Sequence, residues 1–209
     1  MKTVFNWFVK LTGWLIQKIV FNTKIYYEDK SVQSRRIKGP AIIVSNHTSV
    51  YDYAVFLFVF PMRTLRYQMA EILFSKKGLG GFLKALGGIK VERGNYNFGF
   101  VEESKRILDK GGVVGIFPES RIPKEGEITP LPFKPSAAYL ALYANVPIIP
   151  VYTNGEYFHG KRARVVIGKS FMAKDLYDEG KDEKTNLLII SDCIRSKVVN
   201  LRAYINGKE

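Results

Sequence analysis

The feature that most constrains the fold is a regular alternation of short β-branched runs with longer helical patterns. Strands are expected near residues 41–45, 65–70, 88–92, 113–117, 146–151 and 164–167, and helices near 50–60, 96–110, 136–144 and 181–205. Such alternation is typical of strand–helix–strand units, whose strands pair in parallel. The sequence therefore predicts an α/β fold with a mixed, largely parallel sheet flanked by helices.

The first 21 residues predict an amphipathic helix. A polar stripe with spacings of three or four residues consists of Lys2, Asn6, Lys10, Gly13 and Gln17. Nearly all other positions are apolar, but the lysines leave no charge-free run long enough to cross a bilayer. Lys10 would also interrupt the apolar region of a secretory signal. We expect a helix that lies in a membrane interface, and a helix packed against the core is the alternative.

A polar connector from Tyr26 to Gly39 follows this helix. We therefore expect two parts: a membrane-associating helix with its connector over residues 1–38, and a globular domain over residues 39–209 that includes the C-terminal helix. The single cysteine, Cys193, excludes an intrachain disulfide framework and favours a reducing compartment.

The charge distribution predicts an anionic partner. The formal net charge is +13, with eight basic against two acidic side chains in residues 1–38 and seven against two in residues 61–93. Phospholipid headgroups, nucleic acid and a phosphorylated substrate all fit. The aromatic residues lie inside apolar segments and no nucleic-acid-binding motif is evident, so we expect no nucleic acid partner. A basic membrane-surface or nucleic-acid-binding protein without catalysis is the alternative of a different class.

A histidine and an acid occur together between two apolar runs, in the stretch VSNHTSVYD from Val44 to Asp52. On one continuous helix His47 and Asp52 would point about 140° apart. They can pair if His47 lies in a strand-to-helix turn and Ser49 is the N-cap. A helix N-terminus favours a neutral imidazole, which is what a general base requires. The alternative is that Ser49 and Asp52 form only a capping box.

These residues resemble a known family. NHTSVYD, residues 46–52, is similar to the Asn-His-x-Ser-x-x-Asp signature of the glycerolipid acyltransferases, and three further blocks follow in that family's order. They are GGIKVER at 87–93, FPESR at 117–121 and VPIIPV at 146–151. The resemblance covers roughly residues 39–170. The third block departs from the family pattern, because Ser120 replaces the usual glycine and the threonine before the arginine is missing.

The resemblance implies a glycerol-3-phosphate acyltransferase-like fold and an enzyme that moves a fatty acyl chain from a thioester to the hydroxyl of 1-acyl-glycerol-3-phosphate, giving phosphatidic acid. It implies that His47 is the general base, oriented by Asp52, and that Arg93, Glu119 and Arg121 bind the acceptor phosphate. Alternatively, Glu119 and Arg121 only pair with each other across a tight loop.

The sequence also allows other acceptors and two kinds of donor. The acceptor could be another lysophospholipid, a lyso-aminolipid or glycerol-3-phosphate, and the donor could be acyl-CoA or acyl carrier protein. No other cofactor and no metal is expected. The apolar run 53–62 either lines an acyl tunnel or packs beneath the sheet. We expect a peripheral or monotopic protein on an anionic phospholipid surface, at the cytoplasmic face of the cell membrane.

Overall fold

A computed structural model describes residues 2–92, 99–158 and 160–206. Its sheet contains β1 (Lys24–Tyr27), β2 (Ala41–Ser45), β3 (Leu65–Ala70), β4 (Ile89–Val91), β5 (Val113–Ile116), β6 (Pro147–Thr153), β7 (Arg164–Ile167) and β8 (Phe171–Met172). The order is β1-β7-β6-β2-β5-β3-β4, and β8 pairs with β6. All pairs are parallel except those of β6 with β7 and with β8. The predicted mixed, largely parallel sheet is therefore confirmed.

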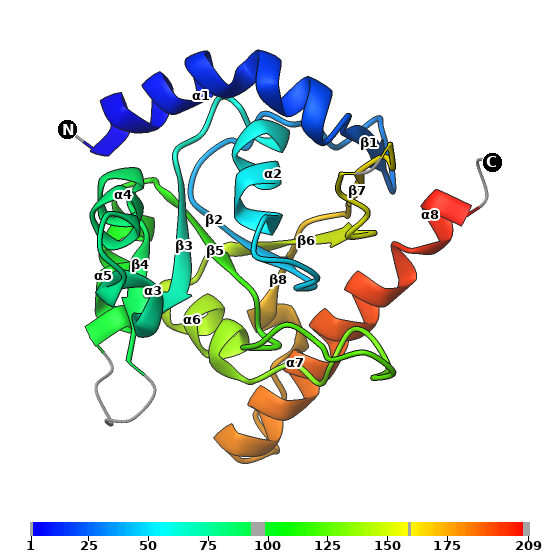
Figure 1. The fold of residues 1–209 in the computed structure, drawn as a ribbon. Coiled ribbons are helices and arrows are strands. Elements are labelled where there is room, and N and C mark those ends of the chain that lie inside the picture. Colours follow the sequence, from blue (N-terminus) through cyan, green and yellow to red (C-terminus); the bar gives the residue numbers. More distant parts are fainter. Residues whose placement is uncertain (1, 93–98, 159, 207–209) are drawn as a thin grey trace.

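Helices cover both faces of the sheet (Figure 1). They are α1 (Lys2–Val20), α2 (Asp52–Val59), α3 (Glu71–Ser75), α4 (Leu79–Leu86), α5 (Gly99–Asp109), α6 (Ser136–Ala144), α7 (Glu183–Asn200) and α8 (Ala203–Asn206), with a 3-10 helix at Ala173–Leu176. The central strand β2 is buried on both sides: Ile43 faces the core under α2, while Ile42 and Val44 face the core under α6 and α7. An apolar strand of this kind is what a sheet covered by helices on both faces requires.

Two parts of the fold differ from the sequence prediction. The connector expected from Tyr26 overlaps β1, which pairs in parallel with β7, so Lys24–Tyr27 belongs to the main sheet. No helix was predicted near residues 78–86, but the glycine-rich stretch at 78–81 enters α4. Gly80 is buried there, and a Cβ atom at this position would lie 2.0 Å from the carbonyl oxygen of Phe74. Close packing, rather than turn formation, explains this glycine.

The first helix has the predicted amphipathic pattern. Its orientation is the reverse of that of a usual surface helix, whose apolar side faces the core. Its polar stripe faces the protein: Asn6 is fully buried, and Lys10 is only 6% exposed. The Lys10 ammonium donates to the carbonyl oxygens of Phe60 at 3.3 Å, Pro61 at 3.1 Å and Arg63 at 2.5 Å, at the C-terminal end of α2. These bonds fasten α1 to α2, and Phe5, Val9 and Val20 of α1 also pack against the core.

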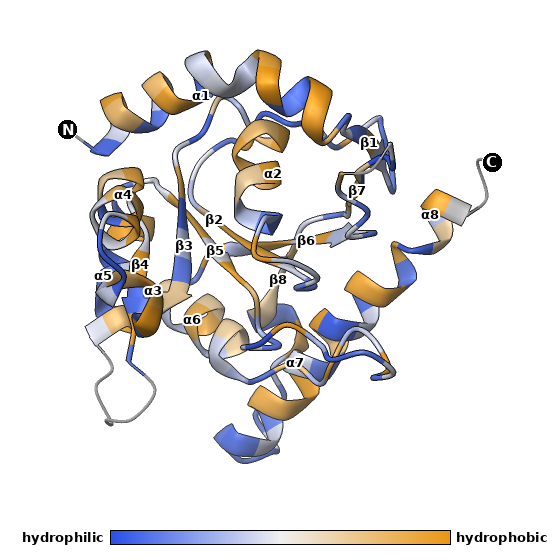
Figure 2. Ribbon diagram, viewed as in Figure 1, coloured by the Kyte–Doolittle hydropathy of each residue, from blue (hydrophilic) through white to orange (hydrophobic). Residues whose placement is uncertain are grey.

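The opposite side of α1 exposes large apolar side chains to solvent. They are Val4, Trp7, Phe8, Leu11, Trp14, Leu15, Ile16 and Ile19, with exposed fractions that reach 80% at Leu11 and 76% at Ile19. Figure 2 shows this hydrophobic character along a helix at the periphery of the molecule. The alternative of a helix packed against the core therefore holds for the side of α1 that carries the polar stripe, where Phe5 and Val9 also pack, but not for this exposed face. None of the helices in the described ranges is long and apolar enough to span a membrane.

Candidate active site

The turn between β2 and α2 brings together the two residues of the His-x4-Asp pattern. His47 lies in this turn, and Asp52 begins α2. The Nδ1 atom of His47 lies 2.8 Å from Oδ2 of Asp52. The imidazole is 21% exposed, whereas the carboxylate is fully buried. The predicted geometry, a histidine before the helix and an acid inside its first turn, is therefore present.

The Asp52 carboxylate is held by further donors. Its Oδ2 accepts the backbone N–H of Thr48 at 2.7 Å and of Ser49 at 3.0 Å. Its Oδ1 accepts the hydroxyls of Thr48 at 2.8 Å and Tyr157 at 2.6 Å. The predicted N-cap was wrong: α2 starts at Asp52, and the Ser49 hydroxyl accepts the N–H of Tyr51 instead. Asp52 thus satisfies turn amides and orients His47 at once.

Tyr157 is a member of this cluster that the sequence analysis missed. It lies in the loop after β6, far from the His47 turn in sequence, and its phenol also contacts the Thr153 hydroxyl at 2.9 Å. Burial raises the pKa of Tyr157, and the nearby negative charge of Asp52 raises it further. The phenol therefore stays protonated and can donate to the carboxylate. No local pattern around Tyr157 signals this role.

Asn46 fastens the turn to the neighbouring strand. Its side-chain amide donates to the Thr153 carbonyl at 2.8 Å, and its side-chain oxygen accepts the Thr153 N–H at 2.9 Å. Both residues are buried. The paired bonds keep the ends of β2 and β6 in register, directly before His47.

Glu119 lies beside His47 but not with the partners that the sequence predicted. One of its carboxylate oxygens accepts the backbone N–H of His47 at 2.7 Å, and the other accepts that of Leu131 at 2.7 Å. The side chain is 4% exposed, and burial raises its pKa. Both oxygens are therefore engaged in holding backbone, which makes Glu119 a support for the histidine turn.

The predicted arginines have different outcomes. Arg121 forms a two-pronged ion pair with Glu127, with N–O distances of 2.6 and 2.7 Å, so the alternative of a Glu119–Arg121 pair is wrong. Its side chain is about half exposed, and it lines the same pocket as His47. Arg93 lies outside the described residues.

An apolar pocket of about 620 Å³ opens beside His47. It is lined by His47, Val50, Tyr51, Tyr53, Gln68, Met69, Ala70, Ile72, Leu73, Leu79, Leu83, Phe117, Ser120, Arg121 and Ile122. The ring of Phe117 stacks on the imidazole, with centroids 4.3 Å apart. Of the apolar run 53–62, Tyr53 lines this pocket, whereas Phe56 and Phe60 are buried in the core. That run therefore contributes mainly to packing.

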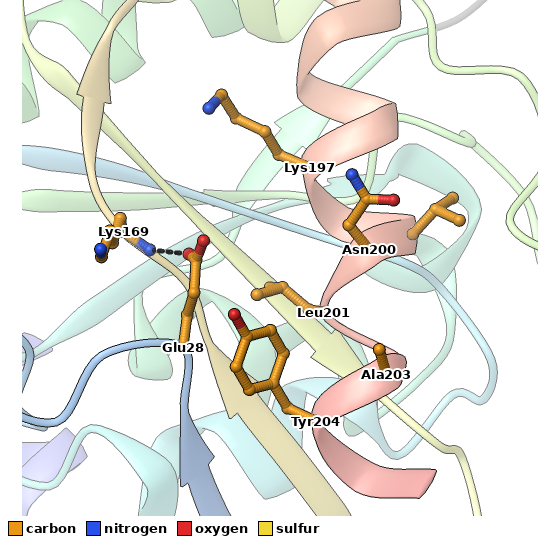
Figure 3. A pocket seen from close by; sticks show the side chains of 8 residues that line it. Glu28, Lys169, Lys197, Asn200, Leu201, Ala203 and Tyr204 are labelled. Carbon is orange, nitrogen blue, oxygen red and sulfur yellow. Dashed lines mark hydrogen bonds between the residues drawn. The ribbon is translucent and has the colours of Figure 1, made fainter. Parts of the chain in front are cut away.

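A second hollow, of about 680 Å³, lies far from this chemistry. It is formed where α7 and α8 meet the end of β1, and Figure 3 shows Glu28 accepting the backbone N–H of Lys169 within it. None of the predicted site residues lines it. The candidate site is therefore the pocket that contains His47.

The arrangement around His47 can perform acid–base chemistry. When Nδ1–H donates to Asp52, the other ring nitrogen, Nε2, is the proton acceptor. The buried carboxylate then stabilises the positive charge that appears when Nε2 takes a proton. An apolar pocket beside such a base fits a substrate with a long hydrocarbon chain.

Comparisons with known proteins agree with this chemistry. A sequence model of the family described as Acyltransferase matches residues 23–154. The chain is 29% identical over 168 residues to human 1-acyl-sn-glycerol-3-phosphate acyltransferase beta. The aligned region covers 78% of this chain and 58% of that protein. It is 27% identical over 116 residues to 1-acyl-sn-glycerol-3-phosphate acyltransferase of Bacillus subtilis strain 168, covering 53% and 56%.

A solved structure supports the fold over nearly the whole chain. The crystal structure of the 1-acyl-sn-glycerophosphate acyltransferase from Thermotoga maritima superposes with a TM-score of 0.63 at 19% identity, covering 99% of this chain and 80% of that one. The chain spans about half the length of the curated relatives that it matches. Because the family model covers well over half of its residues, this chain belongs to the Acyltransferase family.

Proposed function

We propose that this protein transfers a fatty acyl chain from a thioester to the hydroxyl of 1-acyl-glycerol-3-phosphate, which gives phosphatidic acid. The observation that carries the proposal is the His47–Asp52 pair at an apolar pocket of about 620 Å³. The printed names of the relatives support this acceptor. Other lysophospholipids, a lyso-aminolipid and glycerol-3-phosphate are the competing acceptors.

The reaction needs no covalent enzyme intermediate. His47 Nε2 removes the proton from the acceptor hydroxyl as its oxygen attacks the thioester carbonyl. The tetrahedral intermediate then collapses, the carbon–sulfur bond breaks, and the imidazolium returns the proton to the departing thiolate. Asp52 stabilises the imidazolium between these steps. The donor is acyl-CoA or acyl carrier protein, and the mechanism uses no further cofactor.

The acceptor phosphate binds at the rim of the pocket in this proposal. Arg121 contributes a planar guanidinium, which matches two phosphate oxygens at once. It is held there by Glu127. Arg93 follows the end of β4 in sequence and is the second candidate. Glu119 acts indirectly, through the backbone of His47.

Membrane association is the second part of the proposal. The exposed apolar face of α1 inserts among lipids, and the basic N-terminal half adds attraction to anionic headgroups. Apolar side chains that line the pocket, Val50, Ile72 and Leu79, are exposed as well. A peripheral or monotopic protein at the cytoplasmic face of the membrane would receive the lysophospholipid acceptor from the bilayer and the thioester donor from the aqueous side.

The catalytic proposal is tested with a labelled acyl thioester and a panel of lyso-acceptors. Intact protein should acylate 1-acyl-glycerol-3-phosphate fastest, and His47→Ala should lower the rate by roughly 10²–10⁴-fold, because the general base is lost. Thermal unfolding and vesicle binding of the variant should stay near wild type. Full activity of His47→Ala would contradict the mechanism, and faster transfer to another acceptor would change the substrate.

The membrane proposal is tested by vesicle sedimentation with a matched pair of variants. Leu11→Ser/Ile19→Ser changes two exposed positions on α1, and Leu188→Ser/Ile189→Ser makes the same changes at exposed positions on α7. Burying an aliphatic side chain is worth about 1.5–3 kcal/mol, so loss of two should make the α1 variant bind at least about 100-fold more weakly. Equal losses in both variants would contradict insertion of α1.

A further inference from the structure

A separate pocket of about 390 Å³ lies at the C-terminal end of α1. Its lining contains three cationic side chains, Lys18, Arg35 and Arg162, and no acidic one. It shares no lining residue with the pocket of His47. Residues from three separate parts of the chain thus bring positive charge to one hollow.

Each of the three cations is held in place by another contact. Arg35 donates to the carbonyl oxygens of Val59 at 2.7 Å and Phe58 at 2.6 Å. Arg162 donates to the Asn22 carbonyl at 3.0 Å, and the Lys18 ammonium lies 3.9 Å from the ring centroid of Trp14. Because these contacts use only part of each guanidinium, N–H groups remain for a ligand. The cations are therefore oriented before any ligand binds.

The charges in this pocket favour an anion. Ion pairs between described residues do not involve Lys18, Arg35 or Arg162. Like charges around one hollow repel each other, and an entering anion replaces that repulsion with attraction. Guanidinium groups in particular match the oxygens of phosphate.

The position of the pocket points to a lipid as the source of that phosphate. Trp14 lines it, and Trp14, Leu15 and Ile19 are exposed on the apolar face of α1. Tryptophan and basic side chains at the edge of an inserted helix lie at the level of the headgroups. A pocket beside these residues would therefore meet the phosphate layer when the apolar face enters the acyl region.

We infer that the pocket of Lys18, Arg35 and Arg162 binds the phosphate of a membrane phospholipid headgroup, apart from the acyl-transfer site. This inference rests on the proposed membrane association of α1. A headgroup held at this end of the helix sets the depth and rotation of α1, and the Lys10 bonds to α2 link that orientation to the helix that begins at Asp52.

The test uses Lys18→Gln/Arg162→Gln in the full chain, since Arg35 also binds the carbonyl groups that end α2. The matched control is Arg106→Gln/Lys184→Gln, which removes the same charge from exposed positions on α5 and α7. Vesicles consist of an uncharged glycolipid, made equally anionic either with a phosphodiester lipid or with a fatty-acid carboxylate. Dissociation constants are measured by sedimentation at one ionic strength.

Wild type should prefer the phosphodiester vesicles. The pocket variant should bind them about 30-fold more weakly, because each of its two missing cations contributes about 1 kcal/mol. It should also no longer prefer them to the carboxylate vesicles. The affinity of the control variant for either kind of vesicle should fall by less than about threefold. Equal losses in the two variants, or an equal loss by the pocket variant on both vesicles, would overturn the inference and leave only general electrostatics.

Two further outcomes separate the sources of failure. Inorganic phosphate that binds wild type as tightly as the vesicles do and binds the pocket variant more weakly, both measured by calorimetry, would assign the pocket to a soluble anion and overturn the lipid assignment. Wild type that binds neither vesicle would refute the proposed membrane association itself. Wild type that binds both vesicles equally would refute only the phosphate pocket.

Discussion

Replacing Asp52 by asparagine tests whether the charge of this side chain, rather than its shape, supports His47. Because Oδ2 faces three N–H donors, the asparagine oxygen should take that place, and the amide nitrogen then faces the hydroxyls of Thr48 and Tyr157. Both hydroxyls can turn to accept, and Tyr157 can donate to Thr153 instead. The variant therefore keeps the tautomer and position of His47 and loses one negative charge.

The size of the effect follows from the distance between the two groups. A charge pair separated by 2.8 Å, the Nδ1–Oδ2 distance, interacts by about 6 kcal/mol at an effective dielectric constant of about 20, and by about 4 kcal/mol at 4 Å. The neutral amide still accepts the imidazolium N–H and recovers part of this. A net loss of about 2–4 kcal/mol corresponds to a decrease in kcat of roughly 30- to 1,000-fold.

The free energy of unfolding should change much less, by under about 2 kcal/mol. Weaker hydrogen bonds to a neutral amide lower stability, but removal of a buried charge also removes its desolvation cost. Urea unfolding measures this quantity, and release of the thiol product measures kcat. Tyr157→Phe is the control, because it removes one donor to Asp52 but keeps the charge, and it should cost less than about tenfold in kcat.

A folded Asp52→Asn protein with kcat within about threefold of wild type would refute this reasoning. Asp52 would then serve only to satisfy the turn amides at the start of α2. Equal decreases in Asp52→Asn and Tyr157→Phe would instead assign the effect to the position of the side chain.

Three further substitutions test the surroundings. Arg121→Met should raise the acceptor KM by the equivalent of about 2–5 kcal/mol and leave the donor KM nearly unchanged, and steady-state kinetics with no change in either would make Arg93 the leading phosphate ligand. Because burial raises the pKa of Glu119 above 4.5, stability should fall as pH rises from 4.5 through that raised value. Thermal unfolding should show no such slope in Glu119→Gln, and an unchanged slope would assign it to another group. Lys10→Met should lower the free energy of unfolding by about 1–3 kcal/mol, because carbonyl groups at the end of α2 lose their donor, and urea unfolding with no loss would show that they find other partners.

Local patterns along the chain were sufficient for most of the fold. The β-branched runs and the helical periods predicted the central strands, since burial on both sides leaves a continuous apolar run such as the one that forms β2. β1 was missed because four residues at the edge of the sheet, beginning with Lys24, carry no such run and depend on pairing with β7. The pairing of His47 with Asp52 was also predictable, because both belong to one turn.

The remaining parts of the site depend on contacts between distant segments, for which a single sequence contains no local signal. Tyr157 reaches Asp52 only because the loop after β6 folds over the start of α2, and Glu119 reaches the backbone of His47 from the end of β5. The orientation of α1 was likewise decided by tertiary contacts. A polar stripe has the same period whether it faces water or protein, and here the carbonyl groups at the end of α2 bind Lys10 and turn the apolar side of the helix outward.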